Sequence, residues 1–97
     1  MFGFVVDLAA SDNTKWTVFP TDVLCKRIHI SGAGSTYHIV PCRILGIPYN
    51  DYIVYMMKNY DVSFTDYTGE IVFKSQNQAK KFCGLLNERF NKLFGGE

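Results

Sequence analysis

The amino-terminal residues alternate between apolar and polar side chains, which is typical of β-strands. Alternate positions from Phe2 to Leu8 are apolar, so residues 2–8 predict a strand with one hydrophobic face. A second run of β-forming residues spans 16–19 and ends at Pro20, which cannot donate a ladder hydrogen bond. The polar segment between the two runs favours a turn. The first twenty residues therefore predict a β-hairpin.

Residues 21–30 fit either of two secondary structures. Thr21 is a suitable N-cap for a short helix, but the same segment also alternates as a strand would. We favour the strand, with residues 31–35 as a glycine-containing loop and residues 36 to about 43 as the returning strand of a second hairpin. Pro41 places the end of that hairpin at a sheet edge or a bulge.

The hydrophobic period changes after residue 48. Aromatic and apolar side chains then recur at the spacing of one helix face, and they are Tyr49, Tyr52, Ile53, Met56 and Tyr60. This spacing predicts a helix within residues 49–60, with Asn50 as its N-cap and Asn59 near its end. β-forming runs at 62–65 and 70–73 follow, and the turn between them ends in glycine, so they predict a hairpin.

Residues 76–94 predict the longest helix of the chain. Ser75 and Gln78 have the spacing of a capping box, in which the serine accepts from a backbone amide and Gln78 reaches back. Gly95 and Gly96 are expected to end the helix. Its apolar stripe consists of Ala79, Phe82, Cys83, Leu86, Phe90, Leu93 and Phe94.

Together these elements predict a single α+β domain over residues 1–97. Their order is ββββ-α-ββ-α, without an internal repeat or a linker. Runs of strands followed by helices favour a mainly antiparallel sheet, here of about five or six strands, with two helices packed on one face.

The composition fits a folded domain and narrows the range of partners. Hydrophobic residues make up 47% of the 97 residues and charged residues 20%, which excludes a disordered chain. A net charge of +1 gives no strong field toward nucleic acid or an anionic membrane. No apolar run is long enough for a membrane span, and the amino terminus lacks the basic region of a signal peptide. Three cysteines without a CxxC motif favour free thiols, so we expect a cytoplasmic protein without a membrane partner.

Candidate catalytic and metal sites are weak in this sequence. Cys25 and His29 mirror His38 and Cys42 in spacing, but strand residues four apart lie roughly 13 Å from each other, too far for one zinc ion. Cys42, beside Arg43, is the most plausible reactive thiol, yet no histidine can be placed next to it. Residues 31–35 lack the lysine and the following helix of a phosphate loop. We therefore expect no metal, no cofactor and no enzymatic activity.

Aromatic residues give the first indication of function. They make up 15% of the chain and include six tyrosines, several of which must lie at the surface of so small a domain. We expect a protein-binding module, an adaptor or inhibitor that occupies a partner's surface, on the scale of accessory proteins of phages and mobile elements. The predicted contact face combines the two helices and consists of Tyr52, Tyr55, Lys58, Lys81, Leu85, Arg89 and Lys92. A homodimer could use the same tyrosines or an unpaired sheet edge.

The alternative is a weak single-stranded nucleic-acid-binding module. Basic and aromatic residues gather on the predicted 24–43 hairpin, and they are Lys26, Arg27, Tyr37, His38 and Arg43. Such residues on a sheet can stack bases and neutralise phosphates. However, the aromatic motif of RNA-recognition domains is absent, and strand alternation divides the set between two faces.

Overall fold

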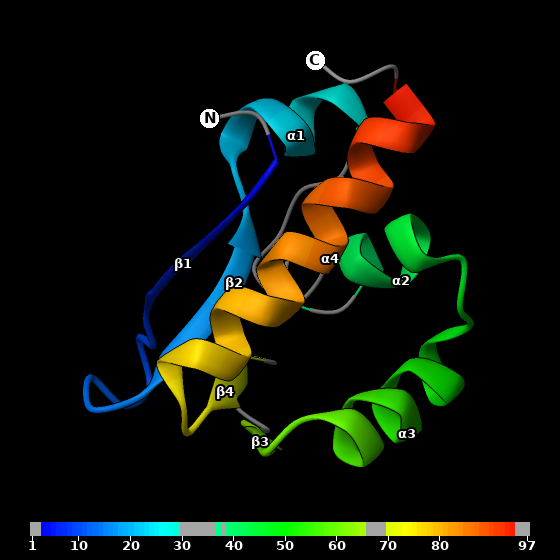
Figure 1. Ribbon diagram of the computed structural model, residues 1–97. Helices are drawn as coiled ribbons and strands as arrows, with labels where there is room; N and C mark the ends of the chain where they lie inside the picture. The colour runs from blue at the N-terminus through cyan, green and yellow to red at the C-terminus, as the bar shows by residue number, and fades with distance from the viewer. Residues whose placement is uncertain (1–2, 30–36, 38, 66–69, 95–97) are drawn as a thin grey trace.

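The protein folds as an α+β domain in the computed structural model, which describes residues 3–29, 37, 39–65 and 70–94 (Figure 1). In these residues, four strands form one antiparallel sheet, accompanied by four helices. In chain order the elements are β1 (Phe4–Leu8), β2 (Trp16–Pro20), α1 (Asp22–Arg27), α2 (Val40–Leu45), α3 (Tyr49–Asn59), β3 (Val62–Phe64), β4 (Ile71–Phe73) and α4 (Gln76–Phe94). The predicted class is therefore confirmed, with fewer strands and more helices than expected.

The sheet has the strand order β1-β2-β4-β3. Leu8 pairs with Trp16, Trp16 with Phe73, and Phe73 with Val62, so these four side chains point to the same face of the sheet. That face is covered by α4, which lies alongside β1 and β2 in Figure 1. The alternation predicted for residues 2–8 thus directs Phe4 and Val6 of β1 toward the long helix.

The core lies between this face and α4. Phe4, Phe73, Phe82, Leu86 and Phe90 are all at most 1% exposed. The rings of Phe73 and Phe82 are 5.8 Å apart, and a closely packed aromatic cluster of this kind is a major contribution to the stability of a small domain. The predicted stripe of α4 is buried from Ala79 to Phe90, whereas Leu93 near its end is 59% exposed.

The predicted second hairpin is wrong, because the parts of it that the structure describes are helical. Residues 22–27 form α1, and the Thr21 hydroxyl accepts a hydrogen bond from the Leu24 amide at 3.3 Å as an N-cap does. Residues 40–45 form α2, where Pro41 occupies the first turn and so needs no hydrogen-bond donor. Residues 31–36, including the predicted loop, lie outside the described part.

Two predicted helix caps also differ from the structure. Helix α3 begins at Tyr49 with Pro48 at the N-cap position, so Asn50 lies inside the helix. At α4, the Ser75 hydroxyl accepts from the Gln78 amide at 3.4 Å as predicted. The Gln78 side chain, however, accepts from the Asp61 amide at 2.7 Å and thereby ties the start of β3 to α4. The predicted stop at residues 95–96 lies outside the described residues.

The sheet edge at β1 is partly closed by α4. The Thr21 amide donates to the Gly3 carbonyl, and the Ala9 amide donates to the Lys15 carbonyl. In an antiparallel pair only every second residue bonds to the partner strand, so Phe4, which follows Gly3, directs its N–H and C=O away from β2. The Asn87 carboxamide bonds to both, at 2.6 and 3.1 Å. This end of the edge is consequently not open to another strand.

A buried carboxylate fastens the turn after β1 to β4. Glu70 is 0% exposed and accepts hydrogen bonds from the amides of Ala10 and Ser11, at 2.9 and 3.0 Å, and from the Ser11 hydroxyl. Tyr37 also bonds to it. Burial raises the pKa of Glu70, but these hydrogen bonds outweigh burial and hold the pKa below its ordinary value of 4.5.

Candidate functional site

A short connection of three residues, 46–48, joins α2 to α3, and we call it and the adjoining helix ends the corner. Gly46 follows α2 with φ of 70° and ψ of 32°, a left-handed conformation that favours glycine. The amides of Gly46 and Ile47 both donate to the Cys42 carbonyl, at 2.8 and 3.1 Å, which completes the end of α2. The Pro48 carbonyl then accepts from the Tyr52 amide at 2.9 Å and starts α3.

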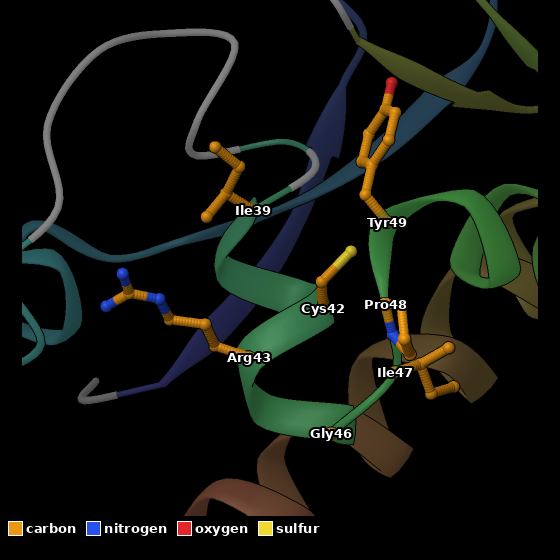
Figure 2. A pocket seen from close by; sticks show the side chains of 7 residues that line it. All are labelled: Ile39, Cys42, Arg43, Gly46, Ile47, Pro48 and Tyr49. Atoms are coloured by element: carbon orange, nitrogen blue, oxygen red, sulfur yellow. The ribbon is translucent and has the colours of Figure 1, made fainter.

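This corner forms an open pocket of about 370 Å³, which we call the corner pocket (Figure 2). Its volume lies within the range of roughly 300–1,000 Å³ that is usual for binding pockets. The lining residues come from the start of α2 to the start of α3, and they are Ile39, Cys42, Arg43, Gly46, Ile47, Pro48 and Tyr49. Among the described residues of this lining, Arg43 is the only charged one, so they offer an apolar surface with one cation.

The cation and the thiol of the corner pocket have different roles. The Arg43 side chain is exposed and has no ion pair within the described residues, and Figure 2 shows its guanidinium extending away from Cys42. Burial raises the pKa of Cys42 to about 11, so its thiol stays protonated at neutral pH. A protonated thiol is a poor nucleophile but a suitable apolar wall.

Exposed apolar side chains occur both in the corner pocket and along α3. In the described part of the chain, seven large hydrophobic residues are exposed; two of them, Ile39 at 42% and Tyr49 at 49%, line the pocket, and two others, Val54 at 57% and Met57 at 65%, lie further along α3. Apolar residues that remain exposed in patches are typical of interaction surfaces. The corner pocket was not predicted from the sequence, because residues 36 to about 43 were expected to form a strand rather than the helix that lines it.

The predicted contact residues on α3 are only partly available. Tyr52 is 0% exposed and therefore lies in the core rather than on a contact surface. Tyr55 is half-buried and packs edge-on against Tyr60, with ring centroids 6.4 Å apart. Lys58 is exposed, as expected.

The predicted contact residues on α4 lie on a different part of the molecule. Lys81, Arg89 and Lys92 are exposed, and Lys92 is 3.6 Å from Glu88 in a pair one turn apart along the helix. Leu85 is half-buried against the core. The main contacts of α4 are with β1, β2, β4 and α2, whereas α3 packs mainly on β3. The structure therefore does not join the two helices into the one face that was predicted.

The residues of the nucleic-acid alternative do not share a sheet. Lys26 and Arg27 are on α1, where the Arg27 guanidinium lies over the Phe94 ring at 5.3 Å, and Arg43 is on α2. Tyr37 is half-buried and bonds to Glu70. His38 lies outside the described residues. A flat stacking platform on a 24–43 hairpin is therefore not formed.

Neither the two other cysteines nor the helices add a second candidate site in the described residues. Burial also raises the pKa values of Cys25 and Cys83, and the Cys83 thiol bonds to the Phe4 carbonyl at 3.2 Å. Over the residues that the structure describes, no three His, Cys, Asp or Glu side chains gather as metal ligands would. In the same residues, no helix has the length and apolar character needed to cross a bilayer. Searches of protein-family models, curated proteins and solved structures give no significant match to this chain.

Proposed function

We propose that the protein is a non-enzymatic protein-binding module, an adaptor or inhibitor, that captures a segment of its partner at the corner pocket. The observation that carries this proposal is an open apolar pocket of about 370 Å³ whose lining includes Arg43, an exposed cation without an ion pair among the described residues. An apolar cavity selects an apolar side chain, and a guanidinium selects a carboxylate by charge-assisted hydrogen bonding.

The chemistry of the partner segment follows from this lining. The cavity accommodates one side chain of about the size of leucine or phenylalanine, in contact with Ile47, Pro48 and Cys42. Arg43 then pairs with an Asp, a Glu or a terminal carboxylate close to that anchor in the partner sequence. Tyr49, half-exposed at the rim, adds an aromatic surface of the kind enriched in protein interfaces.

The direct test is selection of binding peptides from a random display library, with the full-length protein as bait. We expect the wild type to enrich an apolar residue within a few positions of Asp or Glu. Arg43→Glu should change the enriched charge from acidic to basic while keeping the apolar anchor, because only the rim charge is reversed. Ile47→Asp should abolish enrichment, since it places a charge in the apolar lining of the pocket, and circular dichroism should show that the variant stays folded although Ile47 also packs against the core.

Lys80→Glu provides the matched control, because Lys80 is exposed on α4. It should enrich the same peptides as the wild type. Unchanged peptide preferences in Arg43→Glu, with circular dichroism showing that the variant is folded, would overturn the proposal. Capture of nucleic acid instead, lost between about 50 and 200 mM salt, would support the alternative function.

A further inference from the structure

The outer face of α3 consists of exposed residues on the side of the helix away from the core, and it shares no residue with the corner pocket. Its members are Asn50, Asp51, Val54, Met57 and Lys58, all of them exposed. At about 100° per residue, Val54 lies at the centre, with Asp51 and Lys58 on one flank and Met57 on the other. The opposite side of α3 contains the buried Tyr52 and Met56. In Figure 1, α3 is the outermost helix at the lower right.

The two charges on this face are placed at its opposite ends. Asp51 and Lys58 are seven residues apart, which is two turns or roughly 10.5 Å along the helix axis. They are therefore too far apart to pair with each other. Neither residue forms an ion pair with any other residue that the structure describes.

The outer face is complementary to itself in one orientation. When a second α3 lies antiparallel, the flank with Asp51 meets the flank with Lys58 of the second copy at the same height, and the reverse pair forms at the other end. In a parallel two-fold arrangement the charged flanks of the two copies would lie on opposite sides of the seam, so Asp51 could not pair with Lys58 of the second copy. Two-fold symmetry thus converts two unpaired charges into two ion pairs around an exposed apolar centre.

We propose that the outer face of α3 docks on the same face of a second copy of this chain, as an antiparallel helix pair with its two-fold axis near Val54. At the axis the two Val54 side chains meet, and Met57, 65% exposed in the single chain, packs beside them. The arrangement follows the packing of antiparallel helices, with apolar residues at the seam and charges beside it.

The size of the contact sets the strength of the dimer. One three-turn helix buries less than the roughly 800 Å² per partner of a standard interface, so the dimer forms at high protein concentration. The inference goes beyond the proposed function, because Arg43 and Ile47 take no part in the contact. The dimer leaves both corner pockets open, so one assembly can hold two partner segments.

The test is sedimentation velocity of the full chain between about 1 µM and 1 mM, with charge-reversed variants. Asp51→Lys alone and Lys58→Asp alone should each raise the dimer dissociation constant about tenfold, since each replaces two attractive pairs by two repulsive ones. The double variant D51K/K58D should restore it to within about threefold of the wild type. Because the two residues do not contact each other within one chain, rescue can come only from a second copy.

Two further variants keep the result independent of folding. Val54→Asp should abolish dimerisation, and Lys80→Asp, on exposed α4, should leave it unchanged, with circular dichroism showing that both are folded. A wild type that stays monomeric up to 1 mM would overturn the inference and leave α3 to a different partner. A dimer that tolerates the single reversals, or one that the double reversal fails to restore, would also overturn it.

Discussion

The sheet with α4 and the corner made by α2 and α3 are built in different ways. The sheet and α4 are tied together by specific polar contacts, including Asn87 to Phe4 and Glu70 to Ser11. The corner also packs on the core, through Val40, Cys42 and Ile44 of α2 and Tyr52 and Met56 of α3, but it leaves Val54 and Met57 exposed. The Tyr52 hydroxyl is buried without a hydrogen-bond partner in the described residues.

This difference separates stability from recognition. Polar groups such as Asn87 and Glu70 are satisfied by hydrogen bonds within the sheet and α4. The corner has an open apolar pocket, a guanidinium without an ion pair among the described residues, and an exposed helix face, which are features that binding uses. Variants in the two regions should therefore affect different measurements.

The largest effect on stability is expected at Phe82, in the centre of α4. Its ring lies 5.2 Å from Tyr60 and 5.8 Å from Phe73, and it is 1% exposed. Phe82→Ala should lower the free energy of unfolding by about 3–5 kcal/mol, measured by urea denaturation, because it leaves a cavity. Met57→Ala, at an exposed position of α3, should change it by less than about 0.5 kcal/mol. Similar losses for the two variants would contradict the division between the regions.

Glu70→Gln should lower the free energy of unfolding by about 2 kcal/mol at pH 7, because an amide cannot accept all the hydrogen bonds that the carboxylate accepts. The pKa of Glu70 is lowered by folding, so its contribution is present above the unfolded value of about 4.5 and is lost as the pH falls through the folded value. Denaturation at pH 7 and at pH 3 measures both. A difference between wild type and variant that does not shrink in acid would contradict this account.

Gly3→Ala should cost about 1–2 kcal/mol through a clash with Asn87. A Cβ at position 3 would lie 2.1 Å from the Asn87 Oδ1 atom, so the side chain would have to leave Phe4. In an Asn87→Ala background the same substitution should cost little, because the obstacle is gone. A double-mutant cycle by thermal denaturation checks this coupling, and additive losses would show that the clash is not the cause.

Tyr52→Phe should be the smallest change and should have the opposite sign. Removing the unpartnered hydroxyl is expected to leave the free energy of unfolding unchanged or raise it by about 1 kcal/mol, since a buried polar group without a bond is unfavourable. Urea denaturation at neutral pH measures the difference. A loss above 1 kcal/mol would mean that the hydroxyl is satisfied in solution.

The long periodic segments of the fold could be predicted from the sequence, whereas the short helices could not. The stripe of α4 and the alternation of residues 2–8 extend over enough residues to distinguish helix from strand, and residues 16–19 are all β-forming types. Helices α1 and α2 have six residues each, over which the two periods cannot be separated. Local end signals decide there, namely the Thr21 cap and Pro41 in a first helical turn.

The candidate site was predicted less well than the fold. Tyr52 belongs to the apolar stripe that predicted α3, so its burial follows from the helical period of that stripe. The prediction that Tyr52 lies on a contact face was therefore wrong. The exposure of Lys58 on α3 and of the predicted lysine and arginine residues on α4 also follows from the helical period. The corner pocket could not be derived, because it depends on the angle between α2 and α3 and on the turn at Gly46.

The most direct test of the division between the regions is site-specific photo-crosslinking in cells. A benzophenone side chain would replace Tyr49 at the pocket rim, Lys81 on α4 or Asp7 on β1, all of them exposed. We predict a protein adduct from position 49 that Ile47→Asp removes, and none of that mass from positions 81 and 7. An adduct from position 81 or 7 without one from position 49 would contradict the account and place recognition on the sheet or on α4.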